Sequence, residues 1–141
     1  MVPNTIPLNI LIIDDDEIDT LAVKSCFSKL NVPIIYNAAK NGHEALEMLN
    51  SNKESKLDPL PQLIIVDTKM PKMNGIEFLR RLRANKKFDG ISVFMLTGLY
   101  STEDKLATRD LHVAGRVVKP LGQNDALHMY MTALRMPGFQ V

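Results

Sequence analysis

Short apolar runs of strand length recur along the chain, and a stretch with helical spacing of apolar residues follows each run. The runs are Leu8–Ile13, Pro33–Tyr36, Gln62–Val66, Ile91–Leu96 and Gly115–Val118. Among the helical stretches, the pattern is weakest within Thr102–Leu111, and the last stretch covers Asn124–Arg135. The alternation predicts strands and helices that follow one another in turn.

Apolar positions predict which face of the first and last helices is buried. They are Ile18, Leu21, Ala22, Cys26 and Leu30 in the first helix, and Leu127, Tyr130, Met131 and Leu134 in the last. We expect these residues, including the cysteine, to pack against the rest of the protein. Asp16 stands just before the first helix and is expected to be its N-cap.

Strands that alternate with helices need crossover connections, and such connections join parallel strands. The first, third and fourth runs show no polar alternation, as expected of strands that are buried on both faces. The predicted fold class is therefore α/β, a doubly wound parallel sheet of five strands. In such sheets ligands bind outside the carboxyl ends of the strands, where the strand order reverses.

The folded part is expected to cover residues 8–135, with tails at residues 1–7 and 136–141. The polar segment Ser51–Pro61, which contains two prolines, is expected to be a loop rather than a domain linker. A chain of 141 residues is long enough to bury one sizeable core. The single cysteine, Cys26, excludes an internal disulfide.

Charge and hydropathy exclude two classes of partner. The chain has 17 Lys and Arg against 16 Asp and Glu, so it lacks the basic excess that phosphate-backbone binding needs. A local basic stretch is interpreted as a solvated helix face and the loop after it; it comprises Arg80, Arg81, Arg83, Lys86 and Lys87. No signal peptide or membrane-spanning apolar run is present in the sequence. We expect a cytoplasmic protein with no nucleic-acid or membrane partner.

Reactive polar residues stand at the ends of the predicted central strands. They are Asp14 and Asp15 after the first strand, Asp67 after the third, Thr97 after the fourth and Lys119 after the fifth. Aspartate also favours turns and helix starts, which accounts for Asp16. Asp67 follows an apolar run and stands too far from the next helix to cap it. The pattern therefore indicates a site at the carboxyl edge of the sheet.

The chemistry of these residues points to a metal ion and a phosphoryl group. Clustered carboxylates repel one another unless a cation lies between them, and Mg²⁺ prefers oxygen ligands and bridges to phosphate. Mn²⁺ is an alternative ion. One carboxylate can attack a phosphoryl group and form an acyl phosphate. The Thr97 hydroxyl and the Lys119 ammonium can each bind a phosphoryl oxygen.

Four segments resemble the receiver domain of bacterial response regulators of two-component systems, and together they span most of the chain. They are Ile-Leu-Ile-Ile-Asp-Asp-Asp-Glu at 10–17, Ile-Ile-Val-Asp-Thr-Lys-Met-Pro-Lys-Met-Asn-Gly at 64–75, Phe-Met-Leu-Thr-Gly at 94–98 and Val-Val-Lys-Pro at 117–120. The resemblance implies a flavodoxin-like fold with strand order 2-1-3-4-5. It also implies a stand-alone receiver that is switched by phosphorylation.

By the same resemblance, Asp67 is the phosphorylated residue. Asp15 would bind Mg²⁺ directly and Asp14 would help through water. The backbone carbonyl of Lys69 would complete the protein's share of the coordination. Together with Asp67 itself, these groups form the implied metal site.

Thr97 and Lys119 match the hydroxyl and lysine positions of the family, and the bond from Lys119 to Pro120 is expected to be cis. Arg116 stands where the family has its switch aromatic, so the switch position is atypical. Leu99 stands two residues beyond Thr97, where it offers nothing to orient an attacking water. We therefore expect slow self-dephosphorylation.

The implied phosphoryl donor is a sensor histidine kinase or a histidine phosphotransfer protein. Residues 136–141 are too few for an output domain, so the signal is expected to leave through a downstream protein. The expected docking face is formed by the fourth helix, fifth strand and fifth helix, with Tyr100, Arg116 and His112; a homodimer is a further option. His43 and His112 are interpreted as exposed helix residues rather than phosphoryl carriers.

Two alternatives stay open at this stage. One is a pseudo-receiver that binds proteins and is never phosphorylated; the complete set of five site residues argues against it, whereas the atypical Arg116 keeps it open. The other is a phosphatase of the haloacid dehalogenase type, because Asp14-Asp15-Asp16 contains an Asp-x-Asp signature after a strand. That family needs further carboxylates beyond its lysine, and only Asp125 follows Lys119 here.

Overall fold

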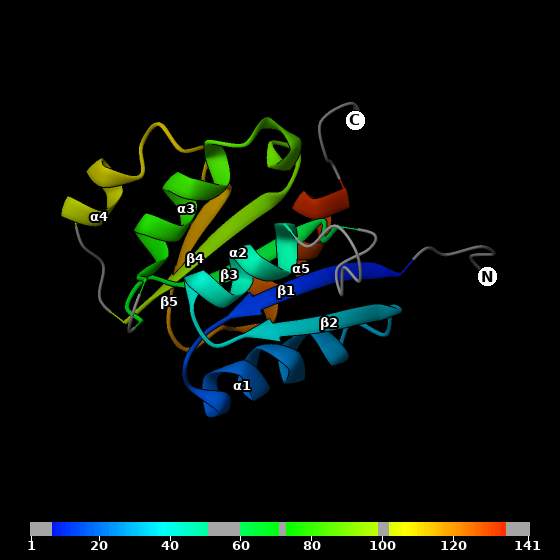
Figure 1. Ribbon diagram of the computed structural model, residues 1–141. Coiled ribbons are helices and arrows are strands. Elements are labelled where there is room, and N and C mark those ends of the chain that lie inside the picture. Colours follow the sequence, from blue (N-terminus) through cyan, green and yellow to red (C-terminus); the bar gives the residue numbers. More distant parts are fainter. Residues whose placement is uncertain (1–6, 51–59, 71–72, 99–101, 135–141) are drawn as a thin grey trace.

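Five parallel strands form the centre of the fold (Figure 1). They are β1 (Leu8–Ile13), β2 (Ile34–Ala39), β3 (Leu63–Asp67), β4 (Ser92–Thr97) and β5 (Gly115–Val118). Their order in the sheet is β2-β1-β3-β4-β5. The predicted fold class and strand order are therefore confirmed.

The computed structural model describes residues 7–50, 60–70, 73–98 and 102–134. Several expectations lie outside these ranges. They concern the N-terminal tail up to residue 6, most of the loop between residues 51 and 61, Leu99 and Tyr100, and the C-terminal tail.

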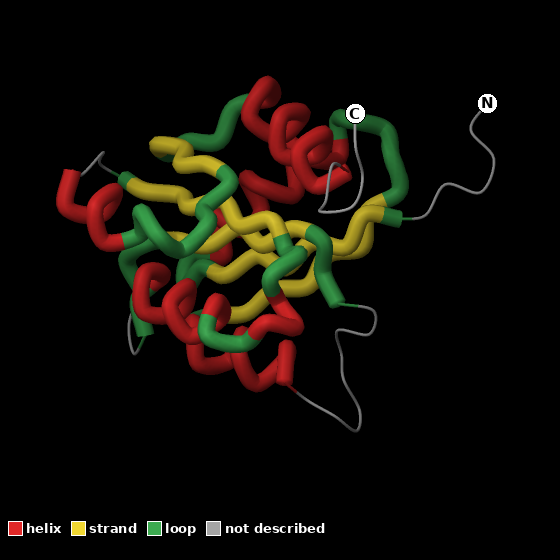
Figure 2. Tube along the Cα trace, turned by 90° about the horizontal axis from the view of Figure 1, so that it is seen from above, coloured by secondary structure: helices red, strands yellow, loops and turns green. Residues whose placement is uncertain are grey.

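The helices cover both faces of the sheet (Figures 1 and 2). They are α1 (Glu17–Ser28), α2 (Gly42–Asn50), α3 (Gly75–Arg83), α4 (Thr102–Ala107) and α5 (Gln123–Leu134), with one 3₁₀ turn, η1 (Lys86–Phe88). α1 and α5 share a core with one face of the sheet, and α2 and α3 share a core with the other. This is the doubly wound arrangement that crossover connections produce.

Strand burial follows position in the sheet. Every residue of β1 and β3 is buried, whereas β2 and β5 at the edges are largely half-exposed. Successive residues of β1 enter opposite cores: Ile10 and Ile12 face α1 and α5, and Leu11 and Ile13 face α2 and α3. The unalternating apolar runs thus mark strands that are covered on both sides, as predicted.

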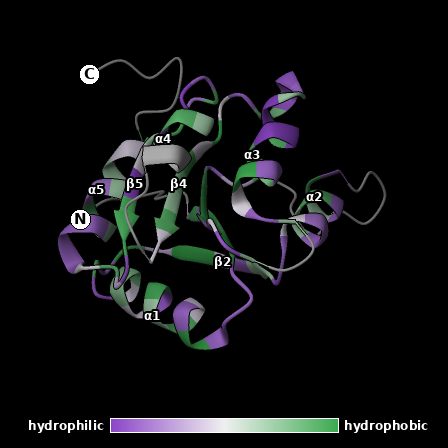
Figure 3. Cartoon of the chain, turned by 90° about the vertical axis from the view of Figure 1, so that its left-hand side faces the viewer, coloured by the Kyte–Doolittle hydropathy of each residue, from purple (hydrophilic) through white to green (hydrophobic). Residues whose placement is uncertain are grey.

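The predicted buried face of α1 is wrong in part: Cys26 and Leu30 pack against the core, but the other expected residues are exposed. Ile18 is 75% exposed and Leu21 is 63% exposed, whereas Thr20, Val23 and Phe27 are buried. In Figure 3, hydrophobic and hydrophilic residues alternate along α1, so apolar character alone does not select one face. The buried face is selected by the bulk of Phe27 and by the packing of α1 on β1 and α5.

The predicted face of α5 is wrong in part for a related reason. Tyr130 packs against the core as expected, but the other three expected residues are 44–46% exposed; they are Leu127, Met131 and Leu134. Ala126, Met129 and Ala133 are buried in their place. Small side chains let a helix approach its neighbours closely, so the alanines rather than the leucines face the sheet.

Cys26 packs against the core, as expected: it is half-buried, and its Sγ donates to the carbonyl of Leu121 at 3.3 Å. His112 is exposed, but it lies between α4 and β5 with a φ of 55°, so it is not a helix residue. His43 is exposed in α2, as predicted.

Arg83 is not part of a solvated helix face. Its guanidinium donates to backbone carbonyls of the segment between α3 and β4 and of the loop that precedes β5; the acceptors are Leu111, Phe88, Asp89, Ile91 and His112, at 2.9–3.5 Å. Burial lowers the pKa of this group. Arg83 therefore joins α3 to the segments that enter β4 and β5.

No helix in the described ranges has the length and apolar character that a membrane crossing requires.

Candidate functional site

Side chains from the carboxyl ends of neighbouring strands meet at one edge of the sheet. Asp67 and Thr97 are the last residues of β3 and β4, while Asp14 and Lys119 directly follow β1 and β5. The strands are in parallel register, with Ile13 opposite Val66 and Asp67 opposite Leu96. The fold thus brings together residues that are far apart in the sequence.

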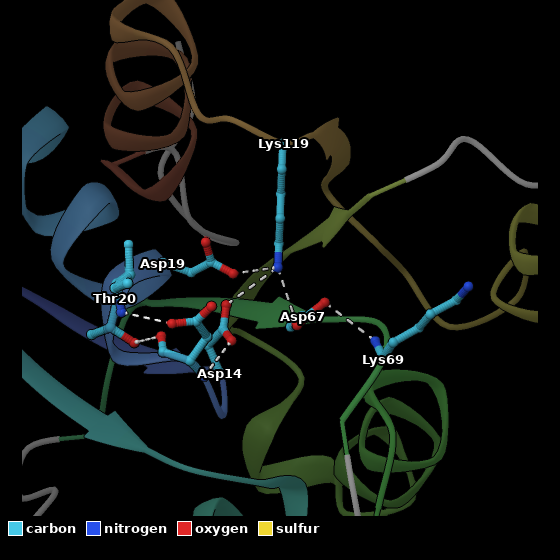
Figure 4. A network of polar contacts seen from close by, with 8 residues as sticks. Asp14, Asp19, Thr20, Asp67, Lys69 and Lys119 are labelled. Atoms are coloured by element: carbon cyan, nitrogen blue, oxygen red, sulfur yellow. Dashed lines mark hydrogen bonds and ion pairs between the residues drawn. The ribbon is translucent and has the colours of Figure 1, made fainter.

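Lys119 is the central cation of this site (Figure 4). Its Nζ lies 2.8 Å from Asp19 Oδ2, 3.2 Å from Asp67 Oδ2 and 3.5 Å from Asp14 Oδ2. Burial by itself lowers the pKa of Lys119, but the hydrogen bonds to Asp19 and Asp67 outweigh it, so the pKa lies above its ordinary value. The ammonium is therefore fully charged at neutral pH.

Asp14 is the most deeply buried carboxylate of the site, with 2% of its side chain exposed. Its Oδ1 accepts from the backbone N–H of Asp16 at 2.9 Å, and its Oδ2 is buried without a hydrogen-bond partner. Burial raises the pKa of Asp14 from 3.8 to about 6, and the nearby charge of Asp67 adds to this effect.

Asp67 is held by the turn that leads from β3 to α3. Its Oδ1 accepts from the backbone N–H of Lys69 at 3.2 Å, and 9% of its side chain is exposed. Gly75 packs directly beneath it, because a Cβ at Gly75 would lie 2.4 Å from the Asp67 carbonyl oxygen and 3.0 Å from Cα of Thr68. A side chain at this position would displace backbone of the site rather than a flexible side chain.

Thr97 is buried beside Asp67, on the neighbouring strand. Its backbone carbonyl accepts from the N–H of Lys119 at 2.8 Å, which ties the end of β4 to the loop that carries the lysine. The peptide bond between Lys119 and Pro120 is cis.

Asp15 is not brought into this cluster, because its side chain is exposed. Asp19, which the sequence did not single out, takes a place there instead. One carboxylate oxygen from each of Asp14, Asp19 and Asp67 lies within 4.8 Å of the others. No local pattern singles out Asp19, because its approach to the cluster depends on how the first turn of α1 lies at the carboxyl edge of the sheet.

The donor set fits a hard divalent cation. The described carboxylates offer only oxygen ligands, and Asp14 Oδ2 is a buried oxygen without a hydrogen bond. Lys119 offsets part of the mutual repulsion among the acidic groups. A divalent ion bound there would offset the rest.

Arg116, at the atypical switch position, lies on β5. Its Nη2 donates to Oγ1 of Thr108, and its Nε is buried without a hydrogen-bond partner. The guanidinium thus connects β5 to the segment that follows α4.

Comparisons with known proteins agree with the observed fold. The family model described as "Response regulator receiver domain" matches residues 10–131. Response regulator Rcp1 of Synechocystis is 27% identical over 87% of this chain and 84% of its own length. The sensor histidine kinase CheAY of Helicobacter pylori is also 27% identical, over 93% of this chain but only 15% of its own length.

Solved structures show the same fold. A two-component response regulator from Legionella pneumophila is 42% identical, with a TM-score of 0.82 over 92% of this chain and 99% of that protein. The Mn²⁺-bound form of Rcp1 is 24% identical, with a TM-score of 0.74 over 96% of both chains.

Proposed function

Because this chain belongs to the response regulator receiver domain family, we propose that it accepts a phosphoryl group on Asp67 in a Mg²⁺-dependent reaction. Receiver domains are phosphoryl-accepting signalling modules rather than enzymes with turnover. The observation that carries the proposal is the Asp67 carboxylate, which stands at the carboxyl end of β3 with a charged lysine 3.2 Å from Oδ2.

The proposed step is attack of an Asp67 carboxylate oxygen on the phosphorus of a phosphohistidine. The O–P bond forms, the N–P bond breaks, and the electron pair returns to the histidine ring of the donor protein. The Lys119 ammonium offsets negative charge on the transferred group. Thr97, buried on the neighbouring strand, is proposed to donate its hydroxyl to a phosphoryl oxygen.

A divalent ion bound at the carboxylates would neutralise charge on the phosphoryl oxygens and orient them. Asp14 and Asp67 are proposed to hold it, with Asp15 and the backbone carbonyl of Lys69 as the further ligands that the family pattern implies. Mg²⁺ is the proposed ion and Mn²⁺ an alternative.

The proposed donor is a sensor histidine kinase or a histidine phosphotransfer protein. The signal is proposed to leave through a downstream protein, or a second copy of the chain, on the face of α4, β5 and α5. Large apolar side chains on this face support the proposal, since Leu106 is 60%, Val118 44% and Met131 46% exposed.

Incubation with Mg²⁺ and acetyl phosphate, followed by intact-mass measurement, tests the function. We expect the wild type to gain the mass of one phosphoryl group and Asp67→Asn to gain none. Chelation of the metal is expected to prevent the gain in the wild type.

The same experiment separates the alternatives. No mass gain in the wild type would favour a pseudo-receiver that only binds proteins. Continuous release of phosphate that depends on Asp14 would favour a phosphatase of the haloacid dehalogenase type.

A further inference from the structure

The shortest contact of the Lys119 ammonium is with a carboxylate outside the strand ends. Asp19 Oδ2 lies 2.8 Å away, compared with 3.2 Å for Asp67 and 3.5 Å for Asp14. The first two contacts are hydrogen bonds, whereas Asp14 Oδ2 has none. Figure 4 shows the ammonium between Asp19 on one side and Asp67 on the other.

Asp19 is a fixed anchor because it lies in the first turn of α1. Asp16 caps this turn, since its Oδ1 accepts from the N–H of Ile18 at 2.8 Å. Lysine, by contrast, carries its charge on a flexible four-carbon stem. The helix therefore fixes the backbone that carries the Asp19 carboxylate, and the lysine stem can follow that carboxylate.

The ammonium and a divalent cation compete for the same oxygens. Oδ2 of both Asp14 and Asp67 faces Lys119 Nζ, and the described acidic cluster offers these same two residues to a metal. A lysine without its Asp19 partner would gain by moving toward the buried Asp14 oxygen, because opposite charges attract strongly where water is excluded.

We propose that Asp19 is a positioning residue, which holds the Lys119 ammonium away from Asp14 and so keeps the Asp14 Oδ2 oxygen available to a divalent cation. The inference rests on the proposed function, which assigns a divalent ion to these carboxylates. The inference assigns a role to Asp19, which lies in α1 and is not one of the reactive residues at the ends of the strands.

Calorimetric titration with Mg²⁺ tests the inference in four proteins: the wild type, Asp19→Asn, Lys119→Gln and the double variant. Asp19→Asn keeps the shape of the side chain and removes its charge. We expect it to weaken Mg²⁺ binding at least about tenfold when Lys119 is present, and less than about threefold in Lys119→Gln. The smaller loss is the direct effect of removing one negative charge near the ion.

Glu17→Gln is the matched control. Glu17 is exposed in the same first turn of α1, and the substitution removes the same charge. We expect its effect on Mg²⁺ affinity to stay below about twofold. Urea unfolding of each variant checks that all of them are folded.

A loss of affinity that is the same in both backgrounds, within about threefold, would overturn the inference, because Asp19 would then act as a ligand or through its charge alone. This outcome is distinguishable from failure of the proposed function. If the wild type binds Mg²⁺ and is phosphorylated on Asp67, the proposed function stands and only the role of Asp19 is rejected. If the wild type does neither, both the proposed function and the role of Asp19 are rejected.

Discussion

At the scale of single residues, Asp14 is the carboxylate of the site whose charge is most unfavourable in the folded protein. One of its oxygens is satisfied by a backbone N–H, and the other is buried without a hydrogen bond. Burial therefore raises the pKa of this carboxyl to about 6. An ionised Asp14 destabilises the folded protein until a cation compensates it, which is typical of a binding residue rather than a structural one.

The pH dependence of stability follows from this shift. The folded state binds the Asp14 proton more tightly than the unfolded state does. The resulting stabilisation is complete below the ordinary pKa of 3.8 and is lost as the pH rises through about 6. In metal-free buffer, we expect the unfolding free energy of the wild type, relative to Asp14→Asn, to fall by up to roughly 3 kcal/mol over this range.

Urea unfolding of both proteins in the presence of a chelator, at intervals across this pH range, measures the difference. Subtracting the unfolding free energy of Asp14→Asn from that of the wild type at each pH removes the contribution of the other acidic groups. If the difference in unfolding free energy between the two proteins stayed constant from acid to neutral pH, the expectation would be contradicted.

At the scale of secondary-structure elements, Arg83 fixes α3 to the loops that precede β4 and β5. Its guanidinium donates to the carbonyls of Leu111, Ile91 and His112, and to that of Phe88, which also accepts from the N–H of Ile91. Loss of the side chain would remove a donor from each of these carbonyls, and a partly buried carbonyl that loses its donor is costly.

Arg83→Met is expected to lower the free energy of unfolding by roughly 2–4 kcal/mol. Arg80→Met is the matched control, since Arg80 lies on the same helix, its side chain is 55% exposed, and it pairs with Glu77 at 3.5 Å. We expect the control to change stability by no more than about 0.5 kcal/mol. Urea unfolding measures both free energies. Equal losses of unfolding free energy in the two variants would show that the replacement of an arginine in α3, and not the loss of the carbonyl contacts, destabilises the protein.

At the scale of the whole molecule, the stability of the fold and the affinity of the site are linked. The sheet order places β1, β3 and β4 side by side, so carboxylates from separate segments converge only when the chain is folded. An ion that binds this cluster binds the folded state alone. Its binding free energy therefore adds to the stability of the protein.

We accordingly expect Mg²⁺ to raise the free energy of unfolding by about 1.4 kcal/mol at ten times its dissociation constant. Thermal or urea unfolding with MgCl₂, against KCl at equal ionic strength, measures the effect. Asp67→Asn should reduce it. A gain that KCl reproduces would mean that screening of the acidic cluster, rather than binding, stabilises the fold.

The order of the elements, and several of the residues that converge at the carboxyl edge of the sheet, could be predicted from the sequence alone. Apolar runs without alternation marked the strands that are buried on both faces, and reactive residues at their ends indicated the carboxyl edge of the sheet. These features are local, because strand propensity and the residue that follows a strand can be read from a few neighbours. Asp14, Asp67 and Lys119 were found in this way.

Which side of a helix is buried, and which carboxylate lies nearest the lysine, depends on tertiary packing and could not be predicted from the sequence. α1 and α5 carry apolar residues on several sides, so their buried faces depend on the shape of the partner: Phe27 and Ala126 pack inside while Ile18 stays exposed. Asp19 contacts Lys119 across 100 residues of sequence, whereas Asp15 at the strand end points to solvent. Such contacts depend on how α1 lies on the sheet, and no local pattern encodes that distance.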